Sequence, residues 1–298
     1  MSSILVLLNP HAGGGRAMRF EPGIRARIRT DHPGVRFVVT ESIQTAHELI
    51  GDTKPDARIV LVGGDGTVNR MLPALTGSGR TLAIVPMGSG NDIARALGLH
   101  KLAWPQALAH AITAPASPMD VGQVAFDDRT VPFLACCTSG FDSAVALRAL
   151  NCPRWLRGLP RYLLATLREL AAFRTWHLTV HSDGKPLRAG VALFASALNA
   201  PTFGSGIPIA PQASINDGLL DLIVAGRFTR MTTLVMLPKL LIGRHLPDAR
   251  IHTSTFTEMQ IDAQPPVPLA VDGEYIGETA HLVVRLLPAG LLVVARTD

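Results

Sequence analysis

Three short apolar runs in the first third of the chain each lead directly into a glycine-rich turn, and this repetition strongly restricts the possible fold. The runs cover residues 4–8, 58–62 and 82–85, and the turns cover residues 9–15, 63–66 and 86–91. Apolar, β-branched runs of this length are typical of buried strands. Glycine lets backbone N–H groups approach an anion, and a following helix adds unpaired donors and a positive dipole end. The pattern therefore predicts a polyphosphate site.

The segment before residue 122 alternates such apolar runs with helical stretches. A further run at residues 35–39 lies between helical stretches at residues 18–28 and 46–50. This alternation favours βαβ units, a parallel sheet and the α/β class. Ligand sites in these sheets lie at the carboxyl ends of the strands, where all three glycine turns fall. We therefore expect an α/β domain over residues 1–122 that gathers the three turns into one cleft.

From about residue 123 the pattern changes to strand-like runs separated by turns. The runs cover residues 130–137, 177–181, 189–198, 219–225 and 281–287, with helical stretches at 160–173 and 231–242. Their periods favour a mainly antiparallel, β-sandwich-like or barrel-like second domain over residues 123–290. The prolines within residues 265–268, and the Gly-Lys-Pro sequence at residues 184–186, predict turns or connections.

Composition narrows the classes of protein that the chain can represent. A length of 298 residues favours two domains, and no apolar stretch reaches the roughly 18 residues of a spanning helix. Three cysteines, two of them adjacent at Cys136 and Cys137, form neither a disulfide framework nor a zinc pattern, which favours a cytoplasmic protein. The net charge of +5 favours anionic partners. With only 5% aromatic residues, a membrane face is favoured over nucleic acid.

Six motifs occur in order along nearly the whole chain. They are residues 9–15, GGDGTVN at 63–69, PMGSGNDIAR at 86–95, PIAP at 208–211, NDGLLD at 216–221 and VDGE at 271–274. Together they resemble the catalytic domain shared by diacylglycerol kinases, sphingosine kinases and related bacterial lipid kinases. The resemblance implies transfer of the γ-phosphoryl group from ATP, with Mg²⁺, to the hydroxyl of a membrane lipid in phospholipid metabolism. It also implies that residues 291–298 return to the first domain.

The lipid that accepts the phosphoryl group stays open at this point. Diacylglycerol is the leading acceptor, and phosphatidylglycerol, a sphingoid base and ceramide are alternatives, because specificity depends on pocket shape. Two other functions also stay open: a soluble nicotinamide-nucleotide kinase of the NAD kinase type, and a non-catalytic lipid binder gated by nucleotide.

The resemblance and the glycine turns assign a set of nucleotide-binding residues. These are Asn9, Thr40, Gly63, Gly64, Asp65, Gly66, Thr67, Asn69, Ser89, Asn91 and Asp92. Asp65 is expected to hold Mg²⁺ or structured water beside the phosphates, and its alternative is a turn aspartate. Ser89 stands where the family commonly has threonine and keeps the hydroxyl. Asn91 either binds ligand or caps a helix, and Thr40 is either a nucleotide contact or a strand-end hydroxyl.

Two acids near the C-terminus are the candidates for general-base catalysis. Asp272 and Glu274 are separated by one residue, so in a strand both carboxylates would lie on one face. By resemblance we expect Glu274 to accept the proton of the lipid hydroxyl while Asp272 supports it. The alternative is a β-turn with both acids solvated.

A cation site is implied for the NDGLLD motif. The resemblance places Asp217 there as a ligand, with backbone carbonyls of Ser214 and Leu219 as further ligands. Ligation by oxygen alone favours Mg²⁺ or a similar hard cation. An Asp-Gly turn without any metal is the alternative.

Contact with the membrane is expected at the inner face, through peripheral association of a cytoplasmic protein. Four arginines recur at near-helical spacing beside aromatic and aliphatic residues: Arg154, Arg157, Arg161 and Arg168. Such a stretch suits an anionic bilayer, and its alternative is a solvated face over an ordinary core helix. We expect a lipid substrate and no nucleic acid, and a homodimer is left open.

Overall fold

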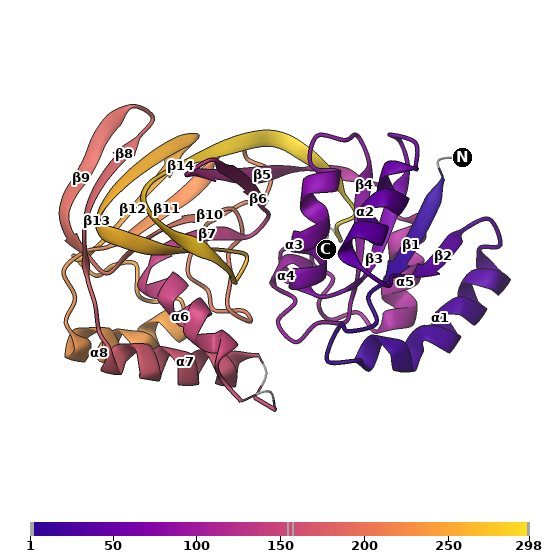
Figure 1. Cartoon of the computed structure of the whole chain (residues 1–298), viewed down its shortest axis with the longest axis horizontal. Coiled ribbons are helices and arrows are strands. Elements are labelled where there is room, and N and C mark those ends of the chain that lie inside the picture. The colour runs from indigo at the N-terminus through magenta and orange to yellow at the C-terminus, as the bar shows by residue number, and fades with distance from the viewer. Residues whose placement is uncertain (1–2, 154, 157, 297–298) are drawn as a thin grey trace. The chain divides into compact units, whose positions relative to one another are not determined.

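The computed structural model describes residues 3–153, 155–156 and 158–296, so Arg154 and Arg157 of the expected arginine face lie outside the described residues. The chain forms two compact units (Figure 1). The first comprises Met1–Met119 with Ala289–Asp298, and the second comprises Asp120–Pro288. The sequence placed this boundary near residue 122 and the return of the chain near residue 291.

The first unit is an α/β domain built on parallel strands, as the sequence predicts. Its strands are β1 (Ile4–Leu8), β2 (Arg36–Val39), β3 (Arg58–Gly63) and β4 (Thr81–Pro86), in the order β2-β1-β3-β4. The end of β14 (Glu274–Val293) adds a further parallel strand through Leu292, which pairs with Thr81. Helices α1 (Arg16–Asp31), α2 (Ile43–Gly51), α3 (Asp65–Leu75), α4 (Asp92–Ala96) and α5 (Trp104–Thr113) connect the strands.

The core of this unit explains why its strands read as continuous apolar runs. Val6, Val60 and Ala83 are fully buried on one face of the sheet, in one cluster with residues of α1 and α5. Their neighbours Leu5 and Ile59 are buried as well. Both faces of a parallel sheet are covered, so its strands lack the polar alternation of an exposed sheet.

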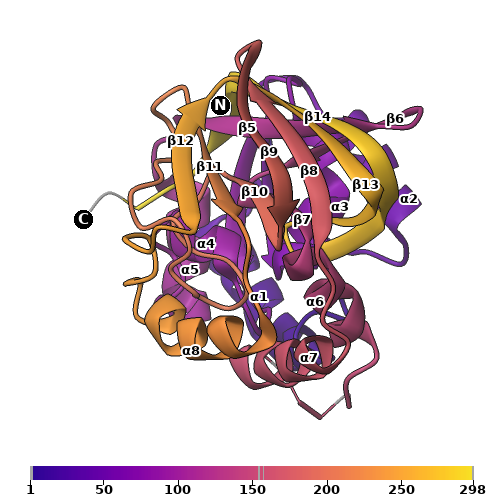
Figure 2. The same ribbon diagram turned by 90° about the vertical axis from the view of Figure 1, so that its left-hand side faces the viewer.

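The second unit is dominated by antiparallel strands. They are β5 (Ser117–Phe126), β6 (Arg129–Phe133), β7 (Cys136–Gly140), β8 (Trp176–Ser182), β9 (Lys185–Ala192), β10 (Phe194–Leu198), β11 (Leu220–Ala225), β12 (Ile251–Phe256), β13 (Glu258–Val271) and most of β14. The main order is β12-β11-β10-β7-β13-β14. Helices α6 (Phe141–Leu150), α7 (Leu159–Ala171) and α8 (Arg230–Leu241) lie together beside these strands (Figures 1 and 2).

Of two expected turns, one lies within a strand in the structure and the other is confirmed at its first residue. The prolines of residues 265–268 lie inside β13, and Pro265 and Pro266 fall where the register with β14 shifts between Asp262 and Val267. A shifted register leaves backbone positions outside the regular ladder, so the missing proline N–H groups are tolerated there. At the other expected turn, Gly184 lies in the turn between β8 and β9 with φ 73°, and Lys185 and Pro186 begin β9. Among the described residues, no helix has both the length and the apolar character needed to span a membrane.

Candidate functional site

The second and third glycine turns touch each other in the first unit. A Cβ atom added to Gly64 would lie 2.7 Å from the Cα of Gly88, so neither position has room for a side chain. The backbone N–H of Met87 also donates to the carbonyl of Gly63 at 2.7 Å. The glycines at these two positions therefore allow a direct contact between the turn after β3 and the turn after β4.

The first glycine turn joins the other two through side chains. Asn9 Nδ2 donates to the hydroxyl of Thr67 at 2.8 Å. Arg16, in the first turn of α1, donates to the carbonyls of Met87 and Gly88 at 3.1 Å each. All three turns thus converge at the carboxyl ends of β1, β3 and β4, as the parallel-sheet prediction requires.

A pocket of about 820 Å³, counted out to its mouth, lies beside these turns. Its lining residues come from the ends of β1, β2 and β3 and from α2 and α3: Leu7, Asn9, His11, Thr40, Glu41, Ser42, Ile43, Ala46, Leu61, Thr67, Arg70 and Met71. Three predicted nucleotide residues, Asn9, Thr40 and Thr67, line this pocket. The Thr40 hydroxyl donates to the carbonyl of Leu8 at 3.1 Å, which holds the end of β2 against β1.

The carboxylate of Asp65 bonds to the beginning of the next helix. Its Oδ1 accepts the backbone N–H of Ile93 at 3.0 Å, and it also bonds the amides of Asn91 and Asp92. Burial and the nearby charge of Asp92 raise its pKa, against the effect of these hydrogen bonds. Two carboxylates that repel each other beside the predicted phosphate site fit a divalent cation, because Mg²⁺ commonly takes one or two carboxylates together with substrate phosphates.

The role of Asn91 differs from the helix cap that the sequence allows. Its backbone is left-handed, with φ 55°, and its side chain makes no capping bond to α4. Instead, Oδ1 accepts the N–H of Gly88 at 2.9 Å and Nδ2 donates to the carbonyl of Gly88 at 3.0 Å. Asn91 therefore closes the glycine turn, and Asp65 supplies the bonds at the start of α4.

The remaining predicted nucleotide residues lie on these same turns and helices. Gly66, Thr67 and Asn69 belong to the first turns of α3, which begins at Asp65. The N–H of Thr67 already donates to the carbonyl of Gly64 at 2.9 Å, so the first helical amides before it are the better phosphate donors. Ser89 is exposed.

The VDGE motif forms a hairpin turn between β13 and β14. Asp272 and Gly273 have φ values of 47° and 82°, and Val271 pairs with Glu274. A two-residue turn favours an Asp-Gly pair because both positions need positive φ. Asp272 therefore lies in the turn rather than in a strand, so the expectation that both carboxylates share one strand face does not apply.

Asp272 is held by three backbone amides. Its Oδ1 accepts the N–H groups of Ala135 and Cys136 at 2.7 and 3.0 Å, and its Oδ2 accepts that of Leu134 at 3.0 Å. The partly buried carboxylate is therefore bonded to backbone rather than only to solvent, and it fixes the turn to the segment that joins β6 to β7. Glu274, the next residue but one, starts β14 with a partly exposed side chain.

The NDGLLD segment has the geometry of a turn. Asp217 Oδ1 accepts the N–H of Leu219 at 3.1 Å, and the Ser214 hydroxyl donates to Asn216 Oδ1 at 3.1 Å. Asp221 nearby has a raised pKa because of burial and the charge of Asp217. Among the described residues, no three His, Cys, Asp or Glu side chains are grouped to hold a metal ion. A cation at Asp217 would thus depend on backbone carbonyls.

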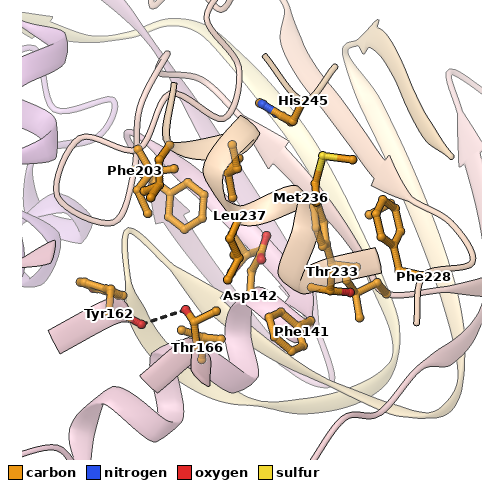
Figure 3. A pocket seen from close by; sticks show the side chains of 18 of the residues that line it. Phe141, Asp142, Tyr162, Thr166, Phe203, Phe228, Thr233, Met236, Leu237 and His245 are labelled. Carbon is orange, nitrogen blue, oxygen red and sulfur yellow. Dashed lines mark hydrogen bonds between the residues drawn. The ribbon is translucent and has the colours of Figure 1, made fainter. Parts of the chain in front are cut away.

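A second pocket lies in the β-rich unit and is almost entirely apolar. Its lining comes from β7, β10, β11 and all three helices, and includes Phe141, Tyr162, Phe203, Phe228, Met236, Leu237 and His245 (Figure 3). Its empty space is about 1000 Å³, counted out to its mouth. Gly273 of the hairpin turn also lines it, and a Cβ added there would lie 2.9 Å from the Tyr162 hydroxyl. The pocket therefore borders the turn that carries Glu274.

One acid, Asp142, points into this apolar pocket (Figure 3). The Ser196 hydroxyl donates to its Oδ2 at 3.3 Å. The side chain borders the empty space of the pocket, but its carboxyl is surrounded by protein. This burial raises the pKa of Asp142 to about 7. A carboxyl in such a place holds its proton far more readily than one in water.

Sequence reasoning missed Asp142, Arg16 and a buried pair behind the NDGLLD segment. Asp120 Oδ2 accepts the N–H of Gly218 at 2.8 Å, and Asn199 Nδ2 donates to the carbonyl of Asp120 at 2.9 Å. Both side chains are at most 3% exposed. In the sequence, Asp120 and Asn199 are single polar residues inside or directly after an apolar strand. Such residues can be recognised as candidates because a buried polar group needs a specific partner.

Comparison with known families agrees with both units. A family model described as the diacylglycerol kinase catalytic domain matches residues 3–124. A second model, described as the YegS C-terminal NAD kinase beta sandwich-like domain, matches residues 135–295, which is more than half of the chain. The expected resemblance and the expected fold class are thereby confirmed.

Individual relatives extend over most of the chain. A diacylglycerol kinase of Mycobacterium tuberculosis (strain CDC 1551 / Oshkosh) is 29% identical over 290 residues, covering 92% of this chain and 89% of its own. The protein named "Probable lipid kinase YegS-like" of Chromohalobacter salexigens is 30% identical over 230 residues, covering 73% and 70%. The crystal structure of a candidate diacylglycerol kinase from Bacillus anthracis str. Sterne shares the fold, with TM-score 0.78, 22% identity and coverage of 99% and 95%. The chain therefore belongs to the lipid kinase family that joins a diacylglycerol kinase catalytic domain to a YegS-type C-terminal domain.

Proposed function

We propose that this chain is an ATP-dependent lipid kinase that transfers the γ-phosphoryl group to the hydroxyl of diacylglycerol. The observation that carries the proposal is the apolar pocket of the β-rich unit, which borders the turn before Glu274. An apolar cavity with a few polar groups at one side is typical of a site for a hydrophobic ligand. Acyl chains in this pocket would leave the lipid hydroxyl near Glu274.

Glu274 is the proposed proton acceptor. Its neighbour Asp272 already accepts three backbone N–H groups, so its role is to hold the turn in place. Phosphoryl transfer depends mainly on positioning and charge neutralisation, so a carboxylate beside the lipid pocket can serve as the base. This division of roles supports Glu274, rather than Asp272, as the proposed base.

The converging glycine turns are the proposed site for ATP. First-turn amides of α3 would donate to phosphate oxygens, with Thr67 and Asn9 fixing the turn around them. Asp65 and Asp92 are the proposed neighbours of Mg²⁺, which would neutralise charge on the transferred group. The single carboxyl in the apolar pocket, Asp142, favours a neutral acceptor such as diacylglycerol, because an uncharged acid can donate a hydrogen bond to an ester or hydroxyl oxygen.

The test is an assay with purified protein, labelled ATP and mixed micelles of single lipids. The panel contains diacylglycerol, phosphatidylglycerol, a sphingoid base and ceramide, with NAD in a separate reaction. We expect labelled phosphatidic acid from diacylglycerol, dependent on Mg²⁺. Label in the NAD product would instead assign the chain to nicotinamide-nucleotide kinases. Tight lipid binding without transfer to any acceptor would make it a non-catalytic binder.

A further inference from the structure

Helix α8 is apolar on the face that points into the protein and also on the opposite face. Its inward residues, Thr233, Met236, Leu237 and Leu240, recur at helical spacing and line the apolar pocket. Its outward residues, Met231, Leu234, Val235, Pro238 and Ile242 just beyond its end, recur at the same spacing. A surface helix normally presents polar residues to water, whereas one that is apolar all round is covered by protein or lipid.

The outward residues are among the most exposed large apolar side chains of the described residues. Met231 is 67% exposed, Val235 and Ile242 are 64% exposed, and Leu234 is 43% exposed. Single exposed apolar residues are ordinary on protein surfaces, but several on one helical stripe mark an interaction surface. We call Met231, Leu234, Val235 and Ile242 the α8 outer stripe.

The charges along the α8 segment are mainly positive. Residues 227–247 contain Arg227, Arg230, Lys239 and Arg244 but no aspartate or glutamate. Arg230 and Lys239 lie on the helix itself and are exposed. Asp248, just beyond this segment, is paired with Arg250 at 2.6 Å, so cations remain in excess. An apolar stripe with an excess of cations beside it complements an anionic bilayer surface, where the cations meet headgroups and the apolar side chains enter the acyl boundary.

The position of the α8 outer stripe beside the apolar pocket is consistent with a bilayer as its partner. Helices α7 and α8 contact each other below the sheet (Figure 2), and both line the apolar pocket. A lipid that leaves the bilayer for that pocket would travel a short path along α8. Of the two α7 arginines expected to meet the membrane, Arg161 donates to the carbonyl of Ala149 at 2.7 Å, whereas Arg168 is exposed and contacts the sulfur of Cys152 at 3.9 Å.

We infer that the α8 outer stripe, with Arg230 and Lys239, is the surface by which this protein docks on an anionic membrane to collect its lipid. The inference rests on the proposed lipid kinase function for its purpose, but vesicle binding tests it without any turnover. Docking by this surface requires insertion of the apolar side chains and attraction between the cations and the lipid headgroups. Separate variants can remove each of these two contributions.

The test compares binding to sedimented vesicles of phosphatidylcholine, with and without phosphatidylglycerol. The variant M231S/V235S/I242S removes the three most exposed apolar side chains of the stripe. We expect it to bind phosphatidylglycerol vesicles at least about tenfold more weakly than the parent protein. The variant R230Q/K239Q should lose the preference for phosphatidylglycerol. The control variant M18S/L187S/L292S changes side chains of 42%, 43% and 38% exposure elsewhere and should bind like the parent.

A second readout separates docking from catalysis. Turnover of a short-chain diacylglycerol dispersed as monomers should be the same in the parent and in M231S/V235S/I242S, which also shows that the variant is folded. Parent-like vesicle binding by this variant, or equal binding of the parent to both vesicle types, would overturn the inference. A parent dimer that the same variant converts to monomer, without any vesicle binding, would assign the stripe to a second copy. Absence of turnover in the parent would count against the proposed function alone.

Discussion

The carboxylate of Asp65 accepts the backbone N–H of Ile93 at 3.0 Å, so the acid that opens α3 also holds the start of α4. This bond couples the turn after β3 to the turn after β4. The two turns also touch at Gly64 and Gly88, and Asn9 and Arg16 tie them to the first turn. The proposed phosphate site is therefore a rigid assembly in which the side chains of Asp65 and Asn91 bond backbone groups.

Replacing Asp65 with alanine should weaken both this assembly and ATP binding. The variant loses the bonds to the start of α4, which by analogy with helix caps are worth about 1 kcal/mol of unfolding free energy. It also loses a proposed neighbour of Mg²⁺. Calorimetric ATP titration and denaturant unfolding would measure the two effects. ATP affinity equal to that of the parent would remove Asp65 from the nucleotide site.

Replacing Gly64 with alanine should disrupt ATP binding through the glycine contact. The new Cβ would lie 2.7 Å from the Cα of Gly88, so the two turns must separate. The matched control is Gly51→Ala at the end of α2, where an added Cβ meets nothing within 4 Å. We expect at least about tenfold weaker ATP binding for Gly64→Ala, since a displacement that costs 1.4 kcal/mol already has this effect. Equal affinities for the two variants would refute the contact's importance.

Changes at Asp272 and Glu274 should separate stability from chemistry. Glu274→Gln is expected to lower kcat steeply while ATP binding and unfolding stay close to those of the parent. Asp272→Asn should lower the unfolding free energy, by about 1–3 kcal/mol for each buried N–H left unpaired. Single-turnover kinetics and denaturant titration measure both quantities. A near-parental rate for Glu274→Gln would move the base to another group.

The pKa of about 7 at Asp142 predicts a pH effect on lipid binding. Below this value the neutral acid can donate a hydrogen bond to a neutral lipid, and above it the carboxylate cannot. Binding of diacylglycerol should therefore weaken as pH rises through about 7, and Asp142→Asn should bind equally across this range. The other titratable groups lining the pocket are Tyr162 and His245, and burial lowers the pKa of His245, which keeps it neutral in this window.

Protonation of Asp142 also makes the stability of the folded state depend on pH. The folded state holds the proton up to about pH 7, whereas the unfolded chain releases it near pH 3.8. Stability contributed by this group is therefore complete below pH 3.8 and declines as pH rises toward 7. Denaturant titrations of the parent and Asp142→Asn across this range would test the direction, and parallel curves would contradict it.

Replacing Asp217 with alanine tests the cation site expected at the NDGLLD segment. If a cation binds there, activity should need a higher Mg²⁺ concentration in Asp217→Ala than in the parent. The exposed Asp128 provides a matched control, Asp128→Ala, which should follow the parent. Superimposable Mg²⁺ titrations of all three proteins would leave Asp217 as the residue that forms a turn with Leu219.

Local sequence patterns were sufficient for the two-unit architecture and for the glycine turns. Buried parallel strands read as apolar runs because both of their faces are covered, and glycine turns can be recognised because few other residues fit their backbones. The prolines of β13 were misread as a turn because only the pairing with β14 reveals the shifted register that accommodates them. Helix α6 was not foreseen, since it follows β7 without a separating loop.

The sequence by itself determined the family, the order of the motifs and the acids available for chemistry. Tertiary structure decided what each acid does: Asp65 bonds the start of α4, Asp272 is held by three amides, and Asp142 faces an apolar pocket. It also revealed that α8 has an apolar outer stripe. The reason is physical, because motif identity follows from neighbours along the chain, whereas hydrogen-bond partners, burial and pKa depend on segments that meet only after folding.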